Sequence, residues 1–151
     1  MHRRHLRRRN AAVMVEVAII LPIMILLIAM AVDAVSGVFR FQQIATLARE
    51  GSRYMCVHAG QYAVDVNQPL TTADQLKNNI LLPMSVSLQP SLLSCQITWL
   101  PSGDAFPYKT TETGSRKQNM VRVVVSYQWQ PIFLLGTPLT LTSASESPIS
   151  R

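Results

Sequence analysis

The chain has 151 residues, enough for one modest domain and an anchoring segment but too few for two ordinary domains. Its formal net charge is +6, with 14 lysine and arginine residues against 8 acids. Five of those cations lie within the first nine positions, and no acid precedes residue 16, so residues 11–151 are close to neutral. The positive charge belongs to a short tail, which excludes a broad basic surface of the kind that binds nucleic acid.

The chain begins with this basic leader, residues 1–11, whose cations are Arg3, Arg4, Arg7, Arg8 and Arg9. In residues 11–32 the only ionisable residue is Glu16. Twenty-two helical residues span about 33 Å, close to the roughly 30 Å hydrocarbon core of a bilayer. We expect a transmembrane helix over residues 12–35, with the arginines cytoplasmic and the chain beyond it exported.

A secretory signal peptide is the alternative, because it also joins a basic start to an apolar run. The stretch "AMAVDAV" that ends the run offers no convincing A-x-A cleavage site, and the helical pattern continues past it. This alternative predicts a secreted chain that begins beyond residue 30.

Glu16 is the anomaly of this segment, since a carboxylate near hydrocarbon costs on the order of 2 to 3 kcal/mol and typically marks a function. One interpretation places it at the cytoplasmic headgroup interface, where it stays hydrated. The other gives it a partner, such as the N-terminal amine of a neighbouring subunit.

A basic leader, a small residue, four uncharged residues, a glutamate and a long apolar helix together resemble the class III signal of type IV pilins and pseudopilins. More narrowly, residues 11–60 resemble the TadE-like family, the minor pseudopilins of the tight-adherence (Flp, type IVb) pilus system. The similarity lies in the glutamate, in the "LP" at residues 21–22 and in "LAREGSRY" at residues 47–54.

The resemblance implies a bacterial inner-membrane protein that a prepilin peptidase cuts on the cytoplasmic side. Glutamate is fifth in the family's mature chains, which places the cut between Ala11 and Ala12, with Ala11 where glycine is usual. The implied partners are the peptidase, other pilin or pseudopilin subunits, the pilus assembly machinery and the lipid bilayer. Glu16 then neutralises the new amine of a neighbouring subunit and sets the axial register.

Beyond Asp33 the sequence becomes amphipathic, and we expect the helix to continue over residues 36–57. Gly37 and Gly51 are expected to weaken this extension by about 1 kcal/mol each relative to alanine. Pro22 favours a kink in the membrane segment, where a proline is tolerated.

Two interpretations stand for "AREGSRY" in this extension. The first is a solvated helix face on which Glu50 and Arg53 pair at i,i+3, worth a few tenths of a kcal/mol. The second is a subunit contact in which Arg49, Arg53 and Tyr54 meet an acidic neighbour.

Residues 58–151 are expected to form an exported α+β domain built on a small antiparallel β-sheet, so that the whole chain has a pilin-like fold. Residues 58–71 read as a linker, and a helix capped by Thr71 or Thr72 covers residues 73–82 until Pro83 ends it. Strands are predicted over residues 84–89, 94–100, 120–130 and 137–147. Residues 101–119 form a long polar loop, interpreted as a mobile hairpin excursion.

Cys56 and Cys95 are expected to face an oxidising compartment, which favours a disulfide between the long helix and the sheet. The alternative is two free thiols that act as small apolar side chains. Two of the three histidines, His2 and His5, lie in the leader, so a histidine-based triad or metal cluster is not expected in the exported domain. We therefore expect no enzymatic activity and no cofactor.

The sequence predicts an interaction protein, a TadE-like pseudopilin that acts through helix–helix packing in or at the base of a pilus. The alternative is a plain single-pass envelope protein whose exported domain binds a partner, with Glu16 merely interfacial. Replacing Glu16 with glutamine distinguishes the two.

Overall fold

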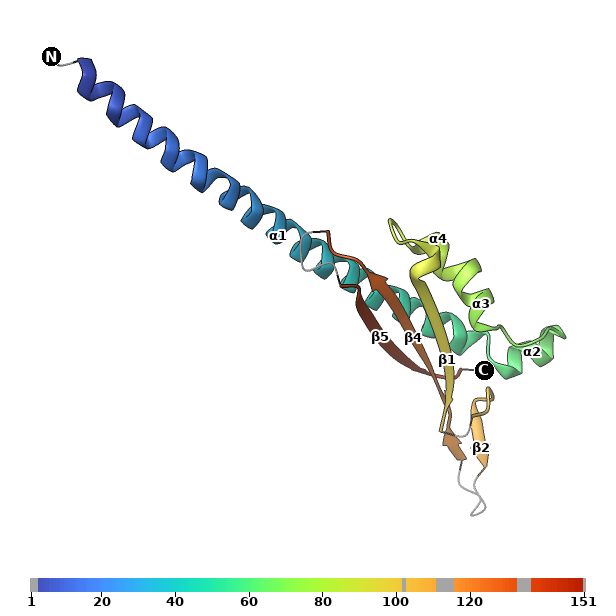
Figure 1. Cartoon of the computed structure of the whole chain (residues 1–151). Helices are drawn as coiled ribbons and strands as arrows, with labels where there is room; N and C mark the ends of the chain where they lie inside the picture. The colour runs from blue at the N-terminus through green and yellow to red at the C-terminus, as the bar shows by residue number, and fades with distance from the viewer. Residues whose placement is uncertain (1–2, 102, 111–115, 133–136, 151) are drawn as a thin grey trace.

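The computed structural model describes residues 3–101, 103–110, 116–132 and 137–150, and their side chains except those of residues 3–12, 109, 110, 116 and 117. Its main feature is α1 (Arg3–Val57), one helix of 55 residues that stands clear of the rest of the chain along its N-terminal half (Figure 1). The helix runs unbroken through the expected boundaries at residues 11, 35 and 36. The predicted long N-terminal helix is confirmed.

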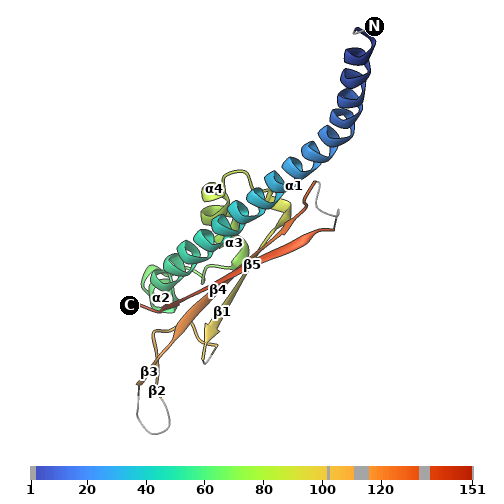
Figure 2. The ribbon, with the colours of Figure 1, turned by 90° about the vertical axis from the view of Figure 1, so that its left-hand side faces the viewer.

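Pro22 lies inside α1 without ending it. Proline lacks the backbone N–H that a helix interior uses, so it favours a local bend. In Figure 2 the N-terminal half of α1 turns away from the direction of the half that packs on the sheet.

The domain that follows α1 is built on an antiparallel sheet of three strands, β1 (Leu93–Leu100), β4 (Met120–Trp129) and β5 (Leu139–Pro148), in the order β1-β4-β5. β4 is the centre, with Ile97 of β1 opposite Val123 and Ser143 of β5 opposite Val125. The predicted small antiparallel sheet is confirmed, and the mixture of long helix and sheet gives the expected α+β class.

Alternation along β4 decides which face of the sheet is covered. Every second side chain is buried, namely Val121, Val123, Val125, Tyr127 and Trp129, while Arg122 and Gln128 between them are exposed. Since successive strand residues point to opposite faces, one face packs inward. The second half of α1 covers that face, in contact with β4 and β5 (Figure 2).

The two glycines of α1 lie where the helix meets the core. A Cβ at Gly37 would come within 2.7 Å of the Trp129 ring, and one at Gly51 within 3.2 Å of Val123 Cγ1. Both glycines were expected only to weaken the helix. The structure shows that each admits a large side chain close to the helix backbone.

A helical run crosses the domain before β1, as expected from its apolar spacing. It comprises α3 (Ala73–Leu76), the π-helical η1 (Lys77–Leu81) and α4 (Leu82–Met84). Thr72 caps it in a reciprocal capping box with Gln75. The wider π turn lets Leu76 and Leu81, five residues apart, both lie fully buried. The run ends at Met84, one residue beyond Pro83, where the sequence placed its end.

Two segments differ from the predictions. Residues 58–71, expected as a linker, contain α2 (Gly60–Val66), whose first N–H donates to the Ala105 carbonyl at 2.8 Å. Residues 84–89, expected as a strand, pair with no strand, because Ser87 takes a φ of 71° and η2 (Pro90–Leu92) follows. Tertiary contacts rather than local pattern set both segments.

The range expected as a long loop, residues 101–119, holds a hairpin of two short strands, β2 (Tyr108–Thr110) and β3 (Arg116–Gln118). Residues 102 and 111–115 lie outside the described part. At its base Asn119 is fully buried, and its side-chain amide donates to the Phe106 carbonyl at 2.8 Å. The Asn119 carbonyl accepts from the N–H of Ile149, which ties the hairpin to the C-terminal end of β5.

Candidate functional site

The N-terminal half of α1 presents apolar side chains on all sides. From Val13 to Val32 no residue is buried, and the mean hydropathy of an 18-residue window in this helix reaches 2.8. A core helix of a soluble domain is covered on at least one face. By length and composition α1 is therefore a candidate membrane span.

Glu16 lies on this surface and is exposed, among the exposed side chains of Val13, Met14, Val15 and Val17. No ion pair or hydrogen bond to Glu16 is found within the described side chains. Its neighbours among the described side chains are apolar, so its carboxylate is available to a group from outside the chain.

The residues predicted for cleavage and orientation also lie in α1. Ala11, Ala12 and the five leader arginines are part of the helical backbone, and their side chains lie outside the described residues. Cleavage between Ala11 and Ala12 stays a prediction, as does the orientation that the arginines favour.

Of the predicted subunit-contact residues, Arg49 and Arg53 are exposed and four residues apart on α1, while Tyr54 is half-buried. Arg53 pairs with Glu50 at 3.6 Å and is 75% exposed, so the pair contributes a few tenths of a kcal/mol at most. Arg49 is exposed as well. Tyr54 instead stacks on His58, with ring centroids 4.0 Å apart. The intrachain ion pair of the first interpretation is confirmed, and the subunit contact stays a prediction.

Sequence reasoning missed the aromatic stack at the C-terminal end of α1. His58 lies between Tyr54 and Tyr62, edge-on to the latter at 4.6 Å, and its Nδ1 lies 3.0 Å from the Tyr54 carbonyl oxygen. The signal was present in the i, i+4, i+8 spacing of the three rings. His58 therefore joins the C-terminal end of α1 to α2.

Both cysteines are free thiols in the structure, so the predicted disulfide is absent. The physical reason is the order of the sheet: α1 packs on β4 and β5, whereas β1, which carries Cys95, is covered by α3. Burial raises the pKa of Cys95 to about 11, with Lys77 lowering it and Asp74 raising it by smaller amounts. Cys56 donates its Sγ–H to the Arg53 carbonyl at 3.0 Å. The alternative of two half-buried thiols describes the structure.

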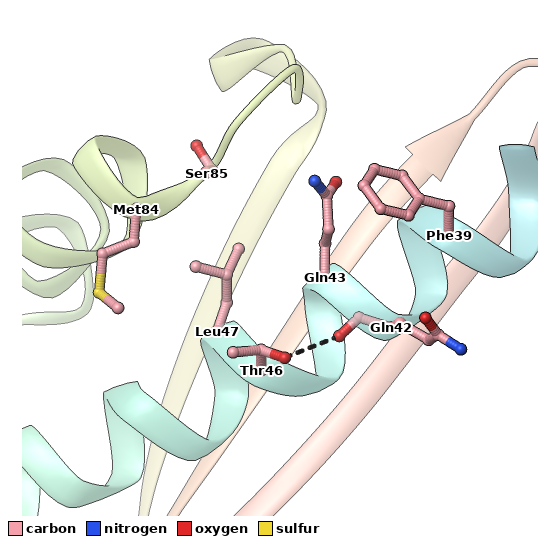
Figure 3. Close-up of a pocket in the computed structure, with 7 residues that line it drawn as sticks. All are labelled: Phe39, Gln42, Gln43, Thr46, Leu47, Met84 and Ser85. Carbon is pink, nitrogen blue, oxygen red and sulfur yellow. Dashed lines mark hydrogen bonds between the residues drawn. The ribbon is translucent and has the colours of Figure 1, made fainter.

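A groove of about 280 Å³ lies where α1 meets the end of α4 (Figure 3). Its lining comprises Phe39, Gln42, Gln43, Thr46, Leu47, Met84 and Ser85. The Gln43 amide donates to the Val86 carbonyl at 3.1 Å, while its oxygen is buried without a partner among the described residues. The polar groups of its lining are two amides and two hydroxyls, and no acidic or basic side chain lines it.

Within the described residues no three histidine, cysteine or acidic side chains lie close enough to hold a metal ion.

One family model matches part of the chain. The model described as TadE-like protein matches residues 11–53. The chain carries a TadE-like segment. That segment contains the uncovered apolar part of α1 from Val13 to Val32, Glu16 and Arg53, and it ends before α2 and the sheet begin. No curated protein and no solved structure matches the chain.

The TadE-like segment and the uncovered apolar helix coincide in the same residues. Together they fit a membrane-anchored, pilus-associated protein. The sheet domain lies outside the matched residues, so the match says nothing of its features.

Proposed function

We propose that this chain is a membrane-anchored TadE-like minor pseudopilin that serves the assembly of a tight-adherence (Flp, type IVb) pilus and has no enzymatic activity. One observation carries the proposal: within the TadE-like segment, α1 exposes apolar side chains on every side, with Glu16 as the only acid up to Val32. Such a surface is stable only against lipid or against other apolar helices.

The orientation follows from charge. Five arginines precede the span and no such cluster follows it, which favours a cytoplasmic N-terminus and an exported C-terminal domain. In a bacterium this arrangement places the protein in the inner membrane as a single-pass protein.

Processing by a prepilin peptidase between Ala11 and Ala12 removes all five leader arginines and creates a new amine at Ala12. Glu16 follows Ala12 by four residues, which is about 6 Å along a helix. Two such helices, staggered by about one turn, bring Glu16 of one subunit to the amine of the next.

This pairing gives Glu16 a physical purpose. An unpaired carboxylate in the membrane costs about 3 kcal/mol, and an opposite charge at hydrogen-bond distance offsets that cost at only one axial stagger. The partners are thus other pilin or pseudopilin subunits, together with the peptidase, the assembly machinery and the surrounding lipid.

The test is Glu16→Gln, which keeps the side-chain shape and removes the charge. Glu50→Gln is the matched control, since Glu50 lies on the same helix beyond the span and pairs only weakly with Arg53. We expect Glu16→Gln to insert normally but to lose pilus assembly in cells, and Glu50→Gln to assemble as the unsubstituted protein does. Unchanged assembly with Glu16→Gln would refute the pairing.

The second candidate function is a single-pass envelope protein whose exported domain binds a partner. The observation that favours it is the groove between α1 and α4. The α4 side of this groove, which includes Met84, lies outside the TadE-like segment. This function predicts that Glu16→Gln is harmless and that Met84→Asp abolishes activity in cells.

A further inference from the structure

The end of the exported domain nearest the span is free of accessible charge. The sequence carries no charged side chain in residues 78–103 or 123–145, which include the connection before β1, the end of β4 and the start of β5. Charged residues on the sheet lie toward its far end, where Arg122 of β4 pairs with Glu146 of β5. The domain is thus polar at one end and uncharged at the other.

Large apolar side chains are exposed at this uncharged end. Val86 is 71% exposed and Ile132 is 80% exposed, each on a connection between elements. Phe39 and Phe41 are exposed on α1, and Leu139 at the start of β5. We call Phe39, Phe41, Val86, Ile132 and Leu139 the exit surface.

Two contacts hold the exit surface at one level of α1. Trp129, the last residue of β4, packs over Gly37 and lies opposite Leu139, the first residue of β5. This contact holds the ends of both strands against α1, and Ile132 follows three residues after Trp129. The Gln43 amide bonds to the carbonyl of Val86. These contacts lie six residues apart on α1, or about 9 Å. Figure 1 shows the end of β4 and the start of β5 directed toward the N-terminal half of the helix.

α1 carries two charged residues close to the exit surface, Asp33 and Arg40, and both are held within the fold. Asp33 is only 7% exposed, so its carboxylate does not interrupt the outward apolar surface. Arg40 donates to the Tyr127 hydroxyl at 3.1 Å and lies 5.8 Å over its ring. The exposed apolar side chains of α1 therefore continue past Asp33 to Phe41, nine residues beyond Val32, where the uncovered apolar part of the helix ends.

That length matches a whole bilayer rather than its core. Ala11 to Phe41 is thirty helical steps, about 45 Å, and a bilayer with its headgroup regions is about 40–45 Å thick. Seated in this way, Glu16 lies near the cytoplasmic edge of the hydrocarbon, and Phe39 to Phe41 lie among the headgroups of the outer leaflet.

We infer that the exit surface is a lipid-binding surface, by which the exported domain rests in the headgroup layer of the leaflet from which α1 emerges. The inference rests on the proposed insertion of α1. The interaction is apolar, because none of the five side chains of the exit surface is charged and the nearby half-buried Arg40 is held against Tyr127. Its consequence is a fixed tilt of the sheet domain relative to the bilayer.

The test uses the full chain with Cys56→Ser and Cys95→Ala, and a single fluorophore-labelled cysteine at Val86 or Ile132. The chain is placed at one copy per phosphatidylcholine nanodisc, with a nitroxide near the lipid headgroup. Val64→Cys is the matched control, since Val64 is 63% exposed on α2 at the far end of the domain. Ile25→Cys, measured with a nitroxide in the middle of the lipid acyl chain, reports the span itself, because Ile25 lies about 21 Å along α1 from Ala11.

We expect labels at Val86 and Ile132 to lose most of their fluorescence to the headgroup nitroxide, the label at Ile25 to lose most of its fluorescence to the acyl-chain nitroxide, and the label at Val64 to lose none to either. Replacing part of the lipid with an anionic one is expected to change nothing. Quenching at Ile25 but not at Val86 and Ile132 would overturn the lipid contact while leaving the anchor intact. No quenching at Ile25 would overturn the insertion itself.

A contact between copies is the competing occupant. It predicts that the labels at Val86 and Ile132 escape the nitroxide and become shielded from aqueous iodide only when several copies share one disc. That result would overturn the lipid-binding surface.

Discussion

Gly37→Ala is the substitution that most directly probes how α1 is joined to the sheet. A methyl at this position would lie 2.7 Å from two ring carbons of Trp129, a separation at which something must shift. Trp129 is largely buried among core residues and has little room to retreat. Overpacking of this kind costs about 1–3 kcal/mol.

The opposing effect is helix propensity, which favours alanine over glycine by about 1 kcal/mol. We therefore expect a net loss of about 1 kcal/mol, equivalent to about 5 °C in the Tm of a domain near 100 residues. Gly51→Ala is the graded comparison, because its Cβ would lie 3.2 Å from Val123 Cγ1, a contact that a small shift relieves. That variant is expected to be near neutral.

Thermal unfolding of the full chain in detergent, followed by near-ultraviolet circular dichroism, measures both variants. A Gly37→Ala/Trp129→Leu pair completes a double-mutant cycle, in which the alanine is expected to become favourable once the ring is gone. Stabilisation by Gly37→Ala in the presence of Trp129 would show that propensity alone governs the position and would refute the packing argument.

Four further outcomes are expected. Because burial raises the pKa of Cys95 to about 11 from 9.0, its thiol should alkylate more slowly than that of Cys56 at neutral pH; equal rates in a mass-spectrometric time course would contradict its burial. The unfolded chain loses this proton first, so stability should fall as pH rises from about 9 to about 11, and Cys95→Ala should flatten that fall. Thr72→Ala removes a capping box and should cost about 1 kcal/mol in the same melts, whereas Thr71→Ala should cost little. Asn119→Ala removes the buried amide at the base of the hairpin and should increase hydrogen exchange at the Asn119–Ile149 junction, and an unchanged exchange pattern would show that the backbone bonds suffice.

The elements predicted correctly are those whose pattern is local. The apolar run and amphipathic extension of α1 repeat over dozens of residues, and β4 alternates over its whole length, so periodicity alone identifies both. The capping box at Thr72 is likewise contained in four residues. In each case the residues that determine the structure are neighbours in sequence.

The elements missed depend on distant partners. α2 has only seven residues, and its first N–H finds its acceptor at Ala105. Residues 84–89 alternate as a strand does, yet Ser87 turns the chain through a positive φ and Val86 bonds to Gln43 of α1. No window of sequence reveals such contacts.

The candidate site divides in the same way. Glu16 and the leader arginines stand out against their immediate neighbours, so the sequence alone identifies them. The disulfide prediction depended on which strands α1 covers, and only the fold shows that α1 packs on β4 and β5 while β1, which carries Cys95, lies at the other edge of the sheet. The exit surface joins three separate segments, and neither spacing nor composition brings them together.

The most direct measurement is the intact mass of the chain retained by carbonate-washed membranes from cells that contain a prepilin peptidase. We predict a membrane-retained chain whose first residue is Ala12, with the arginine-rich leader removed. A chain released by the wash, or one retained with Met1 still in place, would contradict the proposed role.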